Sequence, residues 1–154
     1  MSIVNKMMLV WILLGAIVCA IVLFNVPKED IKDLTTQYQI ITLQGSTFDM
    51  DVIVLITEDT AFAARYVQQH LDTTATSADF DARGVTFSIN DGRSPIVWMP
   101  DANDETVVAH ELLHATINIL NWAGVPLTED TEEAYAYELQ YLTNEFYNQI
   151  KPKQ

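Results

Sequence analysis

The residues of this chain best suited to chemistry are two histidines and a glutamate in the segment His110-Glu111-Leu112-Leu113-His114, which has the pattern HExxH. In an α-helix, residues four positions apart lie on one face, so both imidazoles can reach a single tetrahedral ion at about 2.0–2.1 Å. Glu111 is rotated by about 100° from His110, which keeps it off the ligand face but close enough to hold a metal-bound water. The spacing predicts a zinc-binding helix with two histidine ligands and Glu111 as general base.

The helix that carries this pattern is apolar over most of its circumference, as is typical of a buried helix. Its polar side chains fall on one stripe roughly 100° wide, formed by His110, Glu111, His114, Asn118 and Asn121. A polar stripe on a buried helix must line a cleft or have polar partners, and a metal-binding cleft meets both demands. The alternative is an accidental match, in which two core histidines flank a glutamate, because such short patterns also arise by chance.

A catalytic zinc ion takes three protein ligands and keeps a fourth position for water, so the two histidines leave one ligand to be found. We expect a last helix from about Thr128 to Asn148, and this helix contains Glu132 and Glu133. Either acid is a candidate ligand, and Glu132 lies nearer the apolar face of that helix. Each also has a structural alternative, since Glu133 can form a capping box with Asp130 and Glu132 can compensate the helix dipole.

The segment Asp104–Asn144 resembles the gluzincins, the thermolysin-like HExxH metallopeptidases whose third ligand is a glutamate on a following helix. Glu133 follows His114 by nineteen residues, close to the gap usual in that family, and Ala136 is the small residue that often stands three positions after the ligand. Tyr137 stands where the family usually has an aspartate, so the residues supporting the ligand differ. The resemblance implies zinc-dependent peptide-bond hydrolysis, with Glu133 as third ligand and Glu132 as its alternative.

Two other groups of HExxH proteins can be compared with this segment. The metzincin class needs a glycine and a third histidine further along the same segment, where this chain has Ile117 and Leu120, so that class is excluded. The chain is similar instead to short zincin-like proteins of phages and bacteria, in which HExxH is followed by a Glu-Glu-Ala helix.

The composition limits the partners of the chain. Among its 154 residues, 8 basic side chains stand against 21 acidic ones, and the net charge is -13. This charge argues against nucleic acid and against an anionic membrane surface as partners. Cys19 is the only cysteine, so the chain can form neither an intramolecular disulfide nor a site of several thiolates.

Residues 7–24 form an apolar run of eighteen residues without a charge, long enough to span a bilayer with slight adjustment. The run does not end in the small-x-small pattern of a cleavable signal, so we expect an uncleaved anchor over residues 1–26 and a folded domain over residues 27–154. Lys6 and the amino terminus compete with Lys28 and Lys32 in setting the orientation. We expect a single-pass protein with its amino terminus in the cytoplasm and its domain on the far side.

The residues between the anchor and the HExxH helix predict a small α+β domain, with a short sheet, the HExxH helix and a following glutamate-bearing helix. Alternating and apolar runs bounded by turn residues predict strands over 38–43, 50–56, 85–89 and 96–99, and helical spacing predicts a helix over 57–71. The strand over 96–99 precedes the metal helix and is expected to offer an edge to an extended substrate. Trp98 is expected in the core.

These observations lead to one functional expectation, a membrane-anchored zinc metallopeptidase that acts on peptides or proteins. Three residues could stabilise the developing oxyanion, namely Tyr135, Tyr137 and His70, but nothing in their spacing selects one. His70 is more typical of a solvated or capping residue. The alternatives are an inactive metal-binding module and an anchored structural protein with an accidental HExxH.

Overall fold

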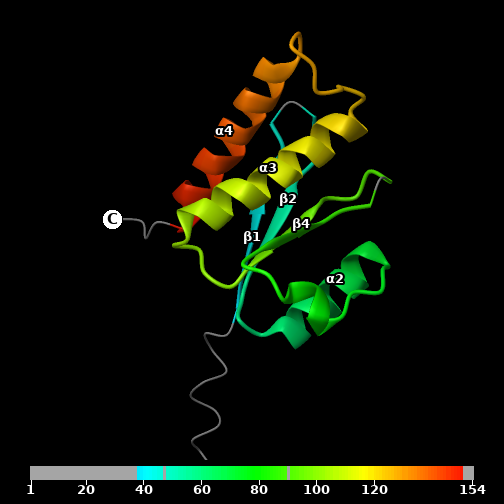
Figure 1. Cartoon of the computed structure of the whole chain (residues 1–154), viewed down its shortest axis with the longest axis vertical. Coiled ribbons are helices and arrows are strands. Elements are labelled where there is room, and N and C mark those ends of the chain that lie inside the picture. Colours follow the sequence, from blue (N-terminus) through cyan, green and yellow to red (C-terminus); the bar gives the residue numbers. More distant parts are fainter. Residues whose placement is uncertain (1–37, 47, 90, 151–154) are drawn as a thin grey trace, which may run out of the picture. The chain divides into compact units, whose positions relative to one another are not determined.

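The computed structural model describes residues 38–46, 48–89 and 91–150 (Figure 1). The chain divides into two units, Met1–Thr36 and Gln37–Gln154, and all described residues belong to the second. The anchor expected over residues 1–26, with its apolar run over residues 7–24, lies outside the described residues. Among the helices of the described part, none combines the length and the apolar character that crossing a bilayer requires.

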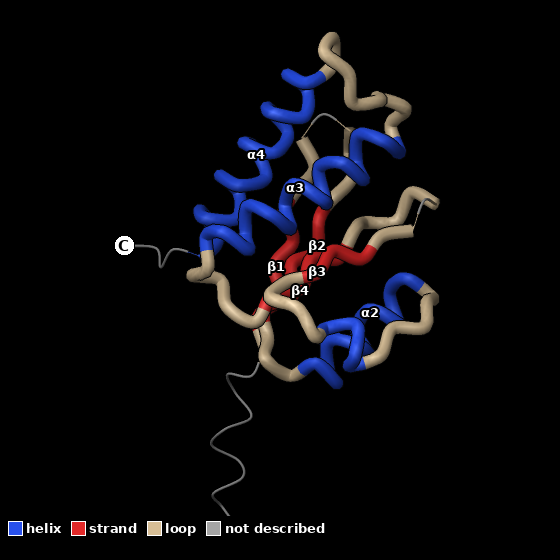
Figure 2. The backbone as a smooth tube through the Cα atoms, viewed as in Figure 1, coloured by secondary structure: helices blue, strands red, loops and turns tan. Residues whose placement is uncertain are grey.

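A mixed four-stranded sheet forms the centre of the second unit (Figure 2). Its strands are β1 (Gln39–Leu43), β2 (Val52–Ile56), β3 (Val85–Phe87) and β4 (Ile96–Met99), in the order β1-β2-β4-β3. The β1–β2 and β3–β4 pairs are antiparallel, whereas β2 and β4 run parallel. With the helices described next, this sheet confirms the expected α+β class.

Helices cover both faces of this sheet (Figure 1). Helix α2 (Thr60–Leu71) and a short 3-10 turn, η1 (Ser77–Phe80), pack on one face over Leu55, Ile96 and Trp98. Helices α3 (Glu105–Trp122) and α4 (Glu132–Ile150) pack on the other face over Val52, Val54, Val97 and Met99. Successive residues of a strand point to opposite faces, so apolar runs such as residues 52–56 supply both cores.

The position of β4 corrects one expectation from the sequence. Residues 96–99 lie between β2 and β3, so the strand before the HExxH helix is interior and not at an edge. All four of its residues are buried, as expected for a strand that has neighbours on both sides and helices on both faces. The edge strand on this side is β3, which reaches α3 through the side chain of Thr86. Trp98 is in the core as predicted, and its Nε1 donates to the carbonyl of Thr57 at 2.9 Å.

Several element boundaries differ from those expected. Helix α2 begins at Thr60, because Asp59 caps it by accepting from the Phe62 amide at 2.9 Å. Helix α4 begins at Glu132, because Thr128 and Thr131 close a separate turn in which the Thr128 amide donates to the Thr131 hydroxyl at 2.9 Å. The loop expected over residues 73–82 contains η1, and β3 ends at Phe87.

Candidate metal centre

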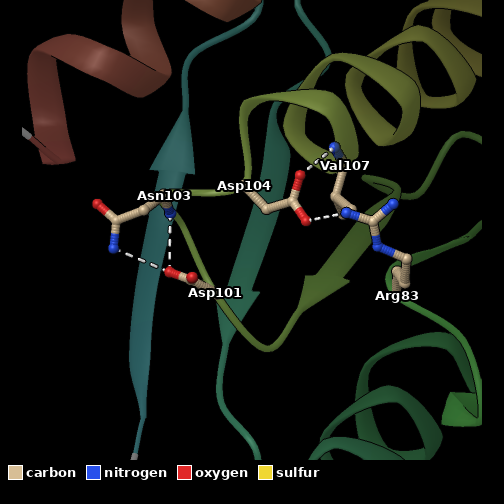
Figure 3. Close-up of polar contacts among 5 residues, drawn as sticks. All are labelled: Arg83, Asp101, Asn103, Asp104 and Val107. Carbon is tan, nitrogen blue, oxygen red and sulfur yellow. Dashed lines mark hydrogen bonds and ion pairs between the residues drawn. The ribbon is translucent and has the colours of Figure 1, made fainter.

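The start of α3 is fixed by the carboxylate of Asp104, its N-cap residue (Figure 3). One oxygen accepts from the Val107 amide at 3.3 Å, and the other is bound by Arg83 from the segment before β3. The hydrogen bond from Arg83 contributes most, and that from the Val107 amide next, to holding the pKa of Asp104 below its ordinary value. Just before the cap, Asp101 accepts from the amide and side-chain nitrogens of Asn103, both at 2.9 Å. The turn that leads into the HExxH helix is therefore held by several hydrogen bonds.

His110 and His114 point in the same direction from adjacent turns of α3. Their Nε2 atoms lie 3.2 Å apart, and both side chains are exposed. Two nitrogens bound at about 2.0–2.1 Å to one tetrahedral ion are separated by about 3.3–3.4 Å, so the observed pair fits a shared ion. The same distance also allows one imidazole to donate a hydrogen bond to the other. The donor chemistry and the geometry of this pair both suit zinc.

Glu111 lies off the ligand face, as its rotation on the helix predicts. Its side chain is buried, with 4% exposure, and Oε2 accepts a hydrogen bond from the Thr86 hydroxyl at 2.8 Å. That hydroxyl is also 3.0 Å from the Glu111 carbonyl oxygen. On the other side, Gly84 is so close that an added Cβ would lie 2.8 Å from Glu111 Cγ. The carboxylate is thus enclosed by β3 and the residues just before it.

A cavity of about 340 Å³ opens beside these residues. Its lining comes from α3 and from the segment before β3: Ala82, Arg83, Gly84, Thr106, Val107, His110 and Glu111. A bound group could therefore meet a histidine nitrogen and the glutamate at the same time. Farther along α3, Asn118 donates to the His114 carbonyl at 2.9 Å and accepts from Ser88 at 2.6 Å. The polar stripe expected on this helix lines a cavity at one end and has polar partners at the other.

The two acids proposed as third ligand are both exposed in the first turn of α4. That end of α4 lies beside the end of α3, because the Tyr135 hydroxyl is 3.3 Å from the side-chain oxygen of Asn121. Asn121 follows His114 by two helical turns, about 10 Å along the axis. Within the described ranges, no three His, Cys, Asp or Glu side chains form a group that could hold a metal ion. The structure brings together His110, Glu111 and His114, but not Glu132 or Glu133.

None of the residues considered for the oxyanion lines the cavity. His70 lies on α2, on the opposite face of the sheet, where its exposed ring stacks on Tyr66 with ring centroids 3.9 Å apart. The Tyr135 hydroxyl donates to the Val125 carbonyl at 2.7 Å, and Tyr137 is exposed on α4. His70 is therefore the solvated residue that the sequence favours.

Three residues near the histidines had no role in the sequence analysis, namely Arg83, Gly84 and Thr86. The sequence does indicate the direction of the Thr86 side chain. Because residues 85–87 alternate along a strand, Thr86 points to the face opposite that of Val85 and Phe87. Which residue of α3 it meets depends on how the hairpin packs, and the strand pattern does not contain that information.

Comparisons with protein-family models, with curated proteins and with solved structures found no match to this chain. The resemblance to gluzincins therefore rests on the residues of the Asp104–Asn144 segment alone.

Proposed function

We propose that the chain is a zinc-dependent peptidase, with His110 and His114 as metal ligands and Glu111 as general base. The observation that carries the proposal is the 3.2 Å separation of the two histidine Nε2 atoms beside a buried glutamate that borders a cavity. A chance pairing of core histidines would not require both rings to be exposed and convergent. The anchor over residues 1–26 would hold the domain at a membrane, outside the cytoplasm.

A zinc ion held by His110 and His114 would supply Lewis-acid chemistry, which would lower the pKa of a bound water to about 7 and polarise the scissile carbonyl. The chain's own residues supply the remaining steps. Glu111 accepts a proton from the attacking water and then passes it to the leaving amine, so that it ends the cycle ionised. The two imidazoles must stay neutral at Nε2 to serve as ligands.

The substrate is proposed to be an extended peptide beside β3. This strand ends the sheet on the side of the cavity, so its outer edge can pair with an added strand by main-chain hydrogen bonds. A peptide there would pass Gly84 and reach the space bordered by His110 and Glu111. We therefore propose for β3 the substrate-binding edge that was expected of residues 96–99.

The third ligand remains part of the proposal, with Glu133 preferred and Glu132 as its alternative. Because the first turn of α4 lies about two helical turns beyond His114, an acid there could bind the same ion only if that turn moved toward the histidines. This requirement supports a second candidate function, a metal-binding module without catalysis. In such a module the two histidines bind the ion together with water or with a partner's side chain.

The decisive experiment for the peptidase replaces Glu111 by Gln, which keeps the shape of the side chain but cannot accept a proton. The full chain in detergent is loaded with zinc and incubated with a broad peptide library. Glu111→Gln should retain zinc and lose activity by about 10²–10⁴-fold. A variant as active as the wild type would overturn the role of Glu111. A wild-type protein that binds zinc but cleaves nothing would favour the metal-binding module.

A further inference from the structure

The carboxylate of Glu111 needs a specific partner because it is both buried and close to the histidines. Burial of a charged group without hydrogen bonds is costly. The Glu111 side chain has three rotatable bonds, so without a partner it could rotate toward solvent, yet it is buried. Among the described residues, Thr86 is the donor to this side chain, and its hydroxyl donates to Oε2 at 2.8 Å. Thr86 belongs to a different element, the edge strand β3.

The contact with Thr86 leaves one carboxylate oxygen facing the cavity. An added Cβ on Gly84, a residue that lines the cavity, would lie 3.1 Å from Glu111 Oε1, so this oxygen is on the side of Gly84. Oε2 is held by Thr86 and is directed toward the strand. A general base needs a free oxygen within hydrogen-bond reach of the water that it activates, and Oε1 meets this requirement.

We propose that Thr86 is a positioning residue that holds Glu111 in the orientation of a general base, with Oε2 bound and Oε1 free. This inference rests on the proposed function. The absence of a side chain at Gly84 completes the arrangement, because a methyl group there would occupy the space next to Glu111 Cγ and Val107 Cγ1, at 2.8 and 2.6 Å. Thr86 itself does not line the cavity and its hydroxyl binds Glu111, so its effect on catalysis passes through Glu111.

The chain contains a matched control for this contact. Two residues after Thr86, the hydroxyl of Ser88 donates to the side chain of Asn118 on α3 at 2.6 Å. Both hydrogen bonds link the same β-hairpin to the same helix, but that of Ser88 does not involve Glu111. Loss of either hydroxyl should weaken the attachment of the hairpin, whereas only loss of the Thr86 hydroxyl should disturb the general base.

The test compares Thr86→Val, which has the same shape without the hydroxyl, with Thr86→Ser and Ser88→Ala. In the zinc-loaded full chain, Thr86→Val should lower kcat by about 10–100-fold while KM changes by less than about twofold. Thr86→Ser should restore most of kcat because it restores the donor. Ser88→Ala should lower the melting temperature by about as much as Thr86→Val and leave kcat unchanged. The proposal is wrong if Thr86→Val keeps the wild-type kcat, or if Ser88→Ala loses as much kcat as Thr86→Val.

A second measurement does not require turnover and so separates this inference from the proposed function. Crystal structures of the wild type, Thr86→Val and Thr86→Ser should show the Glu111 carboxylate in the same position in the wild type and in Thr86→Ser, and displaced or disordered in Thr86→Val. If the wild type cleaves no peptide, these structures still decide whether Thr86 positions Glu111. An unchanged Glu111 in Thr86→Val would refute the positioning role even if the protein proves to be a peptidase.

Discussion

The hydroxyl of Tyr135 lies 3.3 Å from the side-chain oxygen of Asn121, which attaches the start of α4 to the end of α3. The same hydroxyl donates to the Val125 carbonyl at 2.7 Å, so the loop between the two helices is attached as well. These contacts fix the offset between the helix that carries the histidines and the helix that carries Glu132 and Glu133.

Zinc affinity should depend strongly on the two histidines. It should also depend on Glu133 if that residue is the third ligand. Replacement of His110 or His114 by Ala should remove most of the affinity, since each supplies one of few ligands. Glu133→Ala should act similarly and Glu132→Ala much less. The measurement is competition with a chromogenic chelator.

Glu129→Ala is the control for this series, because Glu129 is an exposed acid just before α4 that has no proposed role. A larger loss for Glu132→Ala than for Glu133→Ala would reverse the choice of ligand. If Glu133→Ala, Glu132→Ala and Glu129→Ala all bind zinc with the same affinity, water or another group completes the site. In that case Tyr135→Phe, which loosens the attachment of α4 to α3, should not change the zinc affinity either.

The N-cap of the HExxH helix predicts a dependence of stability on pH. Arg83 and the Val107 amide lower the pKa of Asp104, so its carboxylate stabilises the fold above the pKa that it has in the unfolded chain, about 3.9. That stabilisation is lost as the pH falls through the lower pKa of the folded state. Asp104→Ala should therefore melt a few degrees below the wild type near neutral pH, and the two melting temperatures should converge below about pH 4.

Thermal unfolding of the metal-free protein, followed by circular dichroism, measures this difference. Asp104→Asn is the matched variant, because asparagine can still cap the helix but has no charge for Arg83. It should lie between the wild type and Asp104→Ala at neutral pH. A difference between wild type and Asp104→Ala that stays constant down to pH 2 would contradict the assignment.

The membrane anchor is also testable. The uncharged run over residues 7–24 lacks a small-x-small exit, so we expect it to stay attached and to hold the protein in the membrane fraction. Amino-terminal sequencing of protein purified from cells checks this directly. A mature chain that begins after residue 20 and is found in the soluble fraction would show that the segment is a cleaved signal.

The HExxH pair was predictable from sequence because its geometry is local. His110 and His114 are four residues apart, and this spacing puts them on one face of a helix whatever the rest of the fold is. The contact between Thr86 and Glu111 is different, since it joins residues twenty-five positions apart and depends on how the hairpin packs on α3. Likewise, the interior position of β4 depends on its parallel pairing with β2, which no pattern within residues 96–99 specifies. The place of Glu133 depends on the offset between two helices, which the Tyr135 contacts set.

Helix α4 also carries a buried acid that lies outside the HExxH segment and the Glu132–Glu133 pair. Glu138 faces the core from α4 with 3% exposure, and its Oε2 accepts a hydrogen bond from the hydroxyl of Ser46 in the turn between β1 and β2. Its Oε1 has no hydrogen-bond partner among the described residues. Ser46→Ala should lower the free energy of unfolding by about 1–3 kcal/mol, because it leaves the buried carboxylate without that donor.

Glu138→Leu removes the carboxylate itself, so it should cost less than Ser46→Ala, and the double variant Ser46→Ala/Glu138→Leu should be close to Glu138→Leu alone. Urea unfolding of the four proteins forms a double-mutant cycle that isolates the Ser46–Glu138 interaction. If the two single changes are simply additive, the hydrogen bond contributes nothing measurable. If Glu138→Leu proves the most destabilising of the three, the carboxylate must have a further partner that stabilises its charge.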